Sequence, residues 1–360
     1  MEIKMIVNTF NRIWNNMKNK LVYCGLASLL LSFTACESSY NEFPDFDYQT
    51  VYFANQYALR TVELGEDEFV DNSMDNEHKV SINAAWGGGY TNRNNVIIDY
   101  VVDESLCENL YFKGTETPLT VMPVTHYKLA SNQINIPAGS IMGGVEVHLT
   151  DAFFADEKAL GQNYVIPLRM TDVQGADSIL QGKAAVGDPV LTNNGHWSVQ
   201  PKNFILYAVQ YVNPQHGEYL RRGVDKAVIN GASSELVRHE QYVEKDERVY
   251  VTTKSLKDNI LSLSTQDAGG ALFNYDVSLS FADDGTCTVG SVSDELTVSG
   301  TGKFVKDGEK NSLGGKDRDA IYLDYTVDFK GKNMQYATKD TLVLSTRGVQ
   351  GGAAFEIEIK

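Results

Sequence analysis

Short runs of alternating hydrophobic and polar residues recur along most of the chain. Each run is rich in Val, Ile, Thr, Tyr and Phe and is bounded by Gly, Asn, Asp or Pro, the pattern of half-buried β-strands. In the N-terminal half we expect strands at 50–53, 79–84, 95–102, 133–136, 144–149 and 163–170, with one or two helical turns at 151–158. Strands of this length and spacing predict an antiparallel β-sandwich.

A loop rich in Gly, Pro and Asn, from Gly187 to Ser198, interrupts this pattern and predicts a domain boundary near 190–200. Beyond it the expected strands are longer and closer together. They lie at 203–211, 217–221, 247–254, 260–264, 272–281, 286–293, 296–305, 320–329, 333–344 and 353–359. Gly285 and Gly331 lie in short turns between them, as hairpins require. Such sequential strands predict an up-and-down barrel or a curved sheet, of which a lipocalin-like barrel is one form.

The N-terminus has the pattern of a bacterial lipoprotein signal. A short basic region begins at Met17, the expected initiator, and is followed by an apolar run at 21–33 and by Ala35-Cys36. The run is shorter than the roughly 20 residues that span a bilayer. We therefore expect cleavage before Cys36 and lipidation of its sulfur. The alternative is a buried or disulfide-bonded Cys36 beside an uncleaved membrane helix.

These patterns divide the chain into five parts. We expect a signal peptide at 1–35, a lipidated tether at 36–49, a β-sandwich domain at 50–188, a linker at 189–202 and a barrel-like domain at 203–360. After cleavage about 325 residues remain, which is enough for two hydrophobic cores.

Composition excludes several classes of partner. The chain has a formal net charge of −16, and removal of residues 1–35 leaves 27 basic and 46 acidic residues, a net charge of −19. Such a surface repels nucleic acid and anionic lipid. Cys107 and Cys287 are the cysteines left to pair in the mature chain. We expect two independent buried thiols, with a disulfide between them as the alternative.

Two segments carry a family resemblance. The first runs from Tyr127 to Leu168 and includes Gln133-Ile-Asn-Ile-Pro-Ala-Gly-Ser140 and Gly144-Val-Glu-Val-His-Leu149. It resembles the closing strands of an immunoglobulin-like domain of unknown function found on lipoproteins and some glycosidases of Bacteroidota. The second, Asn213-Pro-Gln-His-Gly-Glu-Tyr-Leu-Arg-Arg-Gly223, is similar to the opening of the domain that often follows it.

The resemblance implies a SusE-like or SusF-like role. Proteins of that type are lipoproteins that hold glycans at the outer surface beside a SusC/SusD-like transporter. The acidic export patch expected after the lipidated cysteine is reduced to Glu37 here, so the sequence supports lipidation more strongly than surface exposure.

The sequence shows no motif typical of a catalytic site or a metal site. The Asp-x-x-Asp-x-Asp-x-Glu pattern of family 18 glycosidases is absent, and Asp283 and Asp284 lie in an expected turn. The six histidines lack metal-ligand spacing, and the glycine runs lack a phosphate-loop pattern. We therefore expect no catalytic site, cofactor or metal.

Aromatic residues beside polar ones are the candidates for glycan binding. Trp86 precedes a glycine-rich loop that carries Tyr90 and Arg93, and His196 and Trp197 lie together in the expected linker. Trp86 has an alternative role in closing the first core, and Trp197 in wedging the two domains. Around the second segment, Arg221 and Arg222 are expected to pair with acids inside the barrel.

The sequence therefore predicts an all-β, lipid-anchored outer-membrane protein that binds oligosaccharide or polysaccharide without cleaving it. The alternative is an adhesin or pilus-associated subunit in which the terminal strand, Ala354 to Lys360, takes part in strand exchange. An enzyme ranks third.

Overall fold

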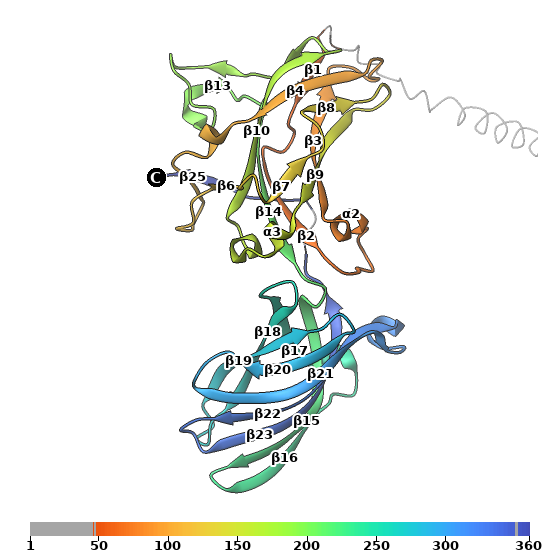
Figure 1. Cartoon of the computed structure of the whole chain (residues 1–360), viewed down its shortest axis with the longest axis vertical. Coiled ribbons are helices and arrows are strands. Elements are labelled where there is room, and N and C mark those ends of the chain that lie inside the picture. Colours follow the sequence, from red (N-terminus) through yellow and green to blue (C-terminus); the bar gives the residue numbers. More distant parts are fainter. Residues whose placement is uncertain (1–45, 47, 350–351) are drawn as a thin grey trace, which may run out of the picture. The chain divides into compact units, whose positions relative to one another are not determined.

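The computed structural model describes residues 46, 48–349 and 352–360, and Asp47–Lys360 forms one compact unit. The expected signal peptide and Cys36 lie outside the described residues. The described chain is all-β, as the sequence predicts, and Figure 1 shows an N-terminal sheet domain and a C-terminal barrel. In the described part, no helix is long and apolar enough to cross a membrane.

The N-terminal domain is built on a 12-stranded sheet. Its strands are β1 (Thr50–Tyr52), β2 (Tyr57–Glu63), β3 (Lys79–Gly87), β4 (Val96–Val102), β6 (Thr120–Val121), β7 (Tyr127–Leu129), β8 (Gln133–Ile136), β9 (Met142–Leu149), β10 (Tyr164–Gln174), β11 (Ser178–Ile179), β14 (Phe204–Val212) and β24 (Ala353–Ala354). Inward side chains from β1, β3 and β9 and from β4, β10 and β14 form a single core, so the sheet encloses its apolar face as a sandwich does.

Smaller elements complete this domain. Two short ladders pair β12 (Lys183–Ala184) with β13 (Trp197–Val199) and β5 (Leu110–Phe112) with β25 (Ile357–Ile359). The helical segments are α2 (Ser73–Asn76), α3 (Asp151–Phe154), η1 (Glu104–Cys107), η2 (Glu157–Leu160) and η3 (Asn194–His196). The α3 and η2 turns confirm the helical turns expected at 151–158.

The C-terminal barrel is an eight-strand meander closed by pairing of its first and last strands. Its strands are β15 (Gly217–Ile229), β17 (Glu247–Thr253), β18 (Asp258–Gln266), β19 (Leu272–Phe281), β20 (Thr286–Ser291), β21 (Leu296–Glu309), β22 (Arg318–Phe329) and β23 (Met334–Thr346). Closure joins β23 to β15 from Glu218 to Ile229. The hairpin strand β16 (Ala232–Arg238) adds to the distal half of β15, and η4 (Val243–Lys245) and η5 (Leu313–Gly315) lie in connections.

The structure corrects the expected assignment of two segments to the barrel. The strand β14, expected there, instead pairs with β10 and runs parallel to β2 from Leu206 to Val212. The terminal segment also returns to the first domain, where β24 pairs with β2 and β25 with β5. Both segments are apolar enough to fit either core. The hydrophobic pattern of a strand does not specify the strand with which it pairs. The chain therefore passes between the two domains twice.

Candidate functional site

Trp86 lies in the core of the first domain. It is the penultimate residue of β3, pairs with Val51 and is 3% exposed. Its indole therefore offers no face to a sugar, and the burial supports the alternative role in closing the core. Tyr90, 68% exposed, and Arg93 lie on the loop between β3 and β4, so the structure does not bring the three candidates onto one surface.

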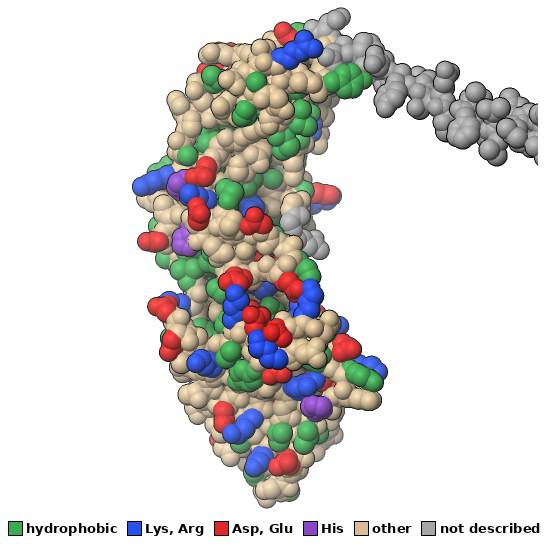
Figure 2. Space-filling view, turned by 90° about the vertical axis from the view of Figure 1, so that its right-hand side faces the viewer, with side chains coloured by type: hydrophobic (Ala, Val, Ile, Leu, Met, Phe, Trp, Pro, Cys, Tyr) green, Lys and Arg blue, Asp and Glu red, His purple; other side chains and the backbone are tan. Residues whose placement is uncertain are grey.

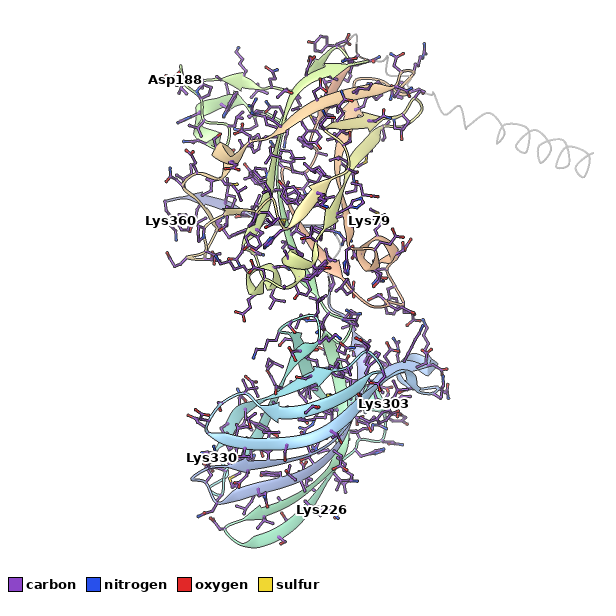
Figure 3. All side chains as sticks on the ribbon, in the orientation of Figure 1. Lys79, Asp188, Lys226, Lys303, Lys330 and Lys360 are labelled. Carbon is purple, nitrogen blue, oxygen red and sulfur yellow. The ribbon has the colours of Figure 1, made fainter. Side chains whose placement is uncertain are left out.

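His196 and Trp197 belong to the β12–β13 hairpin, whose loop carries Asp188 (Figure 3). The Trp197 Nε1–H donates to the Val190 carbonyl at 2.9 Å, and His196 Nδ1 accepts from the Val190 N–H at 3.1 Å. Both half-buried side chains thus hold the hairpin loop together. Because β14 separates this hairpin from the barrel along the chain, the expected role of 189–202 as the interdomain linker is wrong. Residues 213–216 make that connection instead.

A pocket of about 520 Å³, the barrel-wall pocket, opens beside β19 and the turns before β21 and after β22. Its aromatic residues are Phe273, Tyr275 and Phe329. The buried Phe329 ring meets Phe273 and Tyr275 edge to face, with centroids 5.4 and 5.0 Å apart. The two half-buried rings of Phe273 and Tyr275 are thus held in place by a third ring that the barrel core fixes.

The barrel wall is incomplete at this pocket. The strand β19 pairs with β18 from Leu272 to Ser280, but with β20 only from Val277 to Phe281. An antiparallel strand directs alternate N–H and C=O groups to each side. Among the described residues, the 272–276 segment therefore has no ladder partner on the side of β20, and its backbone can bond to a ligand there.

Polar side chains that form no hydrogen bond or ion pair with one another also line this pocket. The pocket is also lined by Asn274, Asp276, Glu295, Lys330 and Lys332. Figure 3 labels Lys330 in the turn after β22. Within the described residues, these five side chains make no hydrogen bond or ion pair, although the Lys332 Nζ lies 4.6 Å from the Phe273 ring centroid. The pocket therefore holds two carboxylates and two ammonium groups without a hydrogen-bond or ion-pair partner in the described chain. One of them, Lys332, lies over the Phe273 ring and interacts electrostatically with Asp267.

Tyr275 lines the pocket, and its hydroxyl interacts electrostatically with Arg221, Asp225 and Asp340 of the barrel. Burial raises the pKa of its hydroxyl to about 12, so the group stays protonated at physiological pH. The hydroxyl makes no hydrogen bond within the described part of the chain. The sequence carries a signal for this site, the alternation Phe-Asn-Tyr-Asp over 273–276 in an expected strand, although these residues were not among the expected glycan-binding candidates.

Arg221 is buried in the barrel and forms ion pairs there, and the half-buried Arg222 pairs with an acid as well. Arg221 Nε donates to Asp340 at 2.9 Å, and Arg221 Nη1 donates to Glu247 at 3.1 Å. Arg222 pairs with Asp246 at 2.6 Å. The expectation that these two arginines pair with acids in the barrel is confirmed. Both arginines therefore have a structural role in the barrel.

A second pocket, the junction pocket, has a volume of about 610 Å³. Its basic lining residues are Lys306, Lys316, Arg318 and Arg347, and each pairs with an acid of the first domain. Basic and acidic side chains are interspersed on the face drawn in Figure 2. Among the described residues, no group of three or more His, Cys, Asp or Glu side chains is arranged to hold a metal ion.

The two cysteines of the described residues, Cys107 and Cys287, are buried and free. Burial raises the pKa of both the Cys107 and the Cys287 thiols to about 12. The expectation of two independent thiols is confirmed, and neither is a reactive thiolate.

Comparisons with known proteins identify relatives over nearly the whole described chain. A model described as "Domain of unknown function (DUF5627)" matches residues 214–348, the barrel, and a model described as an N-terminal domain matches residues 46–177. No curated protein matches the chain.

Solved structures from Bacteroides match as well. A Bacteroides ovatus protein of unknown function is 66% identical, with a TM-score of 0.85, and the match covers 88% of this chain and all of that one. A multidomain protein including DUF1735 from Bacteroides ovatus is 14% identical, with a TM-score of 0.41, over 86% of this chain and all of that one. An auxiliary nutrient binding protein from Bacteroides thetaiotaomicron is 13% identical, with a TM-score of 0.34, over 79% of this chain and 90% of that one. By its identity to the first of these structures along that protein's full length, the chain belongs to the same family as the Bacteroides ovatus protein of unknown function.

Proposed function

We propose that the protein is a non-catalytic, lipid-anchored protein of the outer membrane that binds oligosaccharide in the barrel-wall pocket. The observation that carries the proposal is the combination of aromatic rings with unpaired polar groups in that pocket. A sugar ring has an apolar C–H face that packs on an aromatic ring. Its hydroxyls both donate and accept, so they can bond to a carboxylate such as Asp276 and to an ammonium such as Lys332.

The remaining parts of the proposal follow from the sequence. The signal pattern before Cys36 supports a lipid anchor, and the resemblance to SusE-like and SusF-like proteins supports a role beside a SusC/SusD-like transporter. The adhesin alternative requires a free terminal strand. In the described chain that segment is already paired with β2 and β5, so its donation to another subunit would first break both ladders.

A glycan array probed with the soluble protein spanning Asp47–Lys360 tests ligand binding. This range is one compact unit, and the 66% identical relative crystallised over a comparable span. Calorimetry with the best oligosaccharide then compares wild type with Phe273→Ala. Loss of stacking should weaken binding about tenfold, since base-on-aromatic stacking contributes about 1–3 kcal/mol in other binding sites.

Tyr242→Ala is the matched control, because Tyr242 is an exposed barrel aromatic with a lysine, Lys245, 5.6 Å from its ring centroid. It lies outside the barrel-wall pocket and should bind glycan as wild type does. Equal losses in both variants, or no glycan bound by wild type at millimolar concentration, would refute the proposed site.

Anchoring is tested with the full chain in a Bacteroidota host. Replacement Cys36→Ser removes the sulfur that carries lipid, so palmitate labelling should disappear and the protein should leave the membrane fraction. Undiminished labelling and membrane partition of the variant would contradict lipidation at Cys36.

A further inference from the structure

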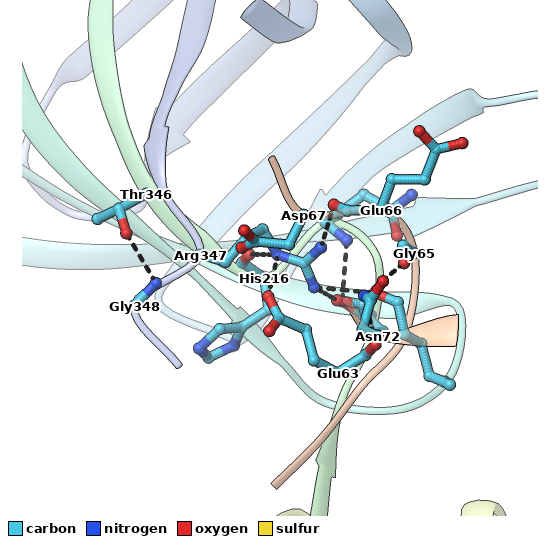
Figure 4. Close-up of polar contacts among 12 residues, drawn as sticks. Glu63, Gly65, Glu66, Asp67, Asn72, His216, Thr346, Arg347 and Gly348 are labelled. Atoms are coloured by element: carbon cyan, nitrogen blue, oxygen red, sulfur yellow. Dashed lines mark hydrogen bonds and ion pairs between the residues drawn. The ribbon is translucent and has the colours of Figure 1, made fainter. Parts of the chain in front are cut away.

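One buried arginine ties together the segments that connect the two domains. Arg347 follows the last barrel strand, and its side chain is 3% exposed. Its guanidinium donates to the carbonyls of His216 and Asn213, each at 2.8 Å, in the first connection between the domains. It also donates to the carbonyls of Leu64 at 2.9 Å and Glu66 at 3.2 Å, just beyond β2 (Figure 4).

These four acceptors are neutral carbonyls. The carboxyl group of Glu63, the last residue of β2, also lies near the guanidinium, with Oε1 at 3.6 Å from Arg347 Nε. Its side chain is also 3% exposed, and Oε1 accepts no hydrogen bond from the part of the chain that the structure describes. A buried carboxylate oxygen without a donor is costly to keep ionised.

Every element packed around Glu63 contributes a charged or titratable group. Asp67, in the loop after β2, and Asp75, in α2, both raise the proton affinity of Glu63, whereas Arg347 lowers it. Asp75 is itself held by Arg60 and by the Glu63 N–H, the latter at 2.9 Å. On the connecting segment, burial and the nearby Arg347 lower the pKa of His216 to about 4, so this ring is neutral.

We propose that the junction is a proton-coupled latch: the closed junction holds a proton on Glu63, and opening of the Arg347 contacts to water releases it. The buried position of Glu63, its unbonded oxygen and the two acids beside it favour the neutral acid while the junction is closed. In water the same carboxyl ionises freely.

The direction of the pH effect follows from the two states. Burial is the main cause that raises the pKa of Glu63 from 4.5 to about 7 in the closed junction. The protonated Glu63 stabilises the closed state fully below pH 4.5, the pKa of the open state. This stabilisation is lost as the pH rises to about 7, the pKa of Glu63 in the closed state. Between pH 6 and pH 8 the opening equilibrium should therefore increase about tenfold.

Hydrogen exchange of three neighbouring amides measures this opening. The N–H groups of Glu63, Leu64 and Gly65 bond to Asp75 Oδ2, the Val212 carbonyl and Asn76 Oδ1. After division by intrinsic exchange rates, their exchange in the wild-type protein should rise about tenfold from pH 6 to pH 8. Amides of β22 in the barrel serve as an internal reference and should show no such rise.

Glu63→Gln is the decisive variant, because it mimics the neutral acid and cannot titrate. Its corrected exchange should be equal at pH 6 and pH 8. A flat wild-type profile, or the same rise in both proteins, would overturn the proposal. Carbon-13 titration of the wild-type Glu63 carboxyl provides a measurement that needs no variant: a midpoint near 7 supports the latch, and one near 4.5 refutes it.

Discussion

The barrel-wall pocket and the junction pocket are similar in volume, about 520 and 610 Å³, and both contain several charged side chains. They differ in what those side chains contact. Each of the four bases of the junction pocket pairs with an acid, whereas the two lysines and two acids of the barrel-wall pocket form no ion pair within the described residues. Charge content alone therefore does not distinguish a binding site from a structural contact, and the partners of the charges do.

The junction also divides into buried and exposed contacts of different energetic weight. Lys306 and Lys316 are more than half exposed, and ion pairs of that kind contribute little to stability because water and salt screen them. Arg347 is buried and has four carbonyl partners and one carboxylate. The stability of the junction should therefore depend mainly on this one side chain.

The largest effect that we expect comes from Arg347→Ala. Removal of the guanidinium leaves four backbone carbonyls without their donor and removes the positive charge beside Glu63, which should cost about 3–5 kcal/mol of unfolding free energy. Urea denaturation followed by circular dichroism measures the loss. Lys306→Ala, which removes an exposed pair in the same pocket, is the control and should leave the midpoint unchanged. Equal midpoints for both variants would contradict the division of the junction into weak and strong contacts.

A smaller effect should follow from Asp276→Ala in the barrel-wall pocket. Asp276 has no protein partner in the described chain, so the variant should keep the wild-type unfolding midpoint. It should bind the oligosaccharide several-fold more weakly, because one ligand hydrogen bond contributes about 0.5–1.5 kcal/mol. Calorimetry and thermal unfolding measure the two quantities on the same sample. A loss of stability with unchanged affinity would mean that this pocket, like the junction, is a structural contact.

Much of the barrel could be predicted from sequence because its pairing is local. The expected strand 272–281 coincides with β19, and 217–221 and 320–329 lie within β15 and β22. Consecutive strands joined by short turns pair with each other, so the alternation of Val277, Leu279 and Phe281 with polar residues fixes both strand and face.

The first domain was less predictable because its pairings join distant segments. The strand β2 was not expected, yet it carries a seven-residue parallel ladder with β14, roughly 150 residues away in the chain. Parallel ladders also join β1 to β11 and β6 to β10, so the antiparallel expectation is only partly correct. No local turn links such strands, and the sequence pattern does not record their partners.

The candidate site shows the same limit. Trp86 and Trp197 stood out in the sequence as large aromatic residues beside polar ones, but one lies in the core and the other secures a hairpin. Phe273 and Tyr275 became site candidates because the Phe329 ring, more than fifty residues later in the chain, packs against both of them. The β19–β20 ladder also covers only Val277 to Phe281, which leaves this part of β19 unpaired on that side.

By itself, the sequence determined the all-β class, the meander of the barrel and the acidic composition, because these depend on residue type and on periodicity over a few residues. It also supplied the lipoprotein pattern on which the proposed anchor rests. Tertiary structure decided which strands share a sheet, which aromatic rings remain accessible and which charges are neutralised. Those properties depend on contacts between residues far apart in the chain, and burial and pairing are set only when those residues meet.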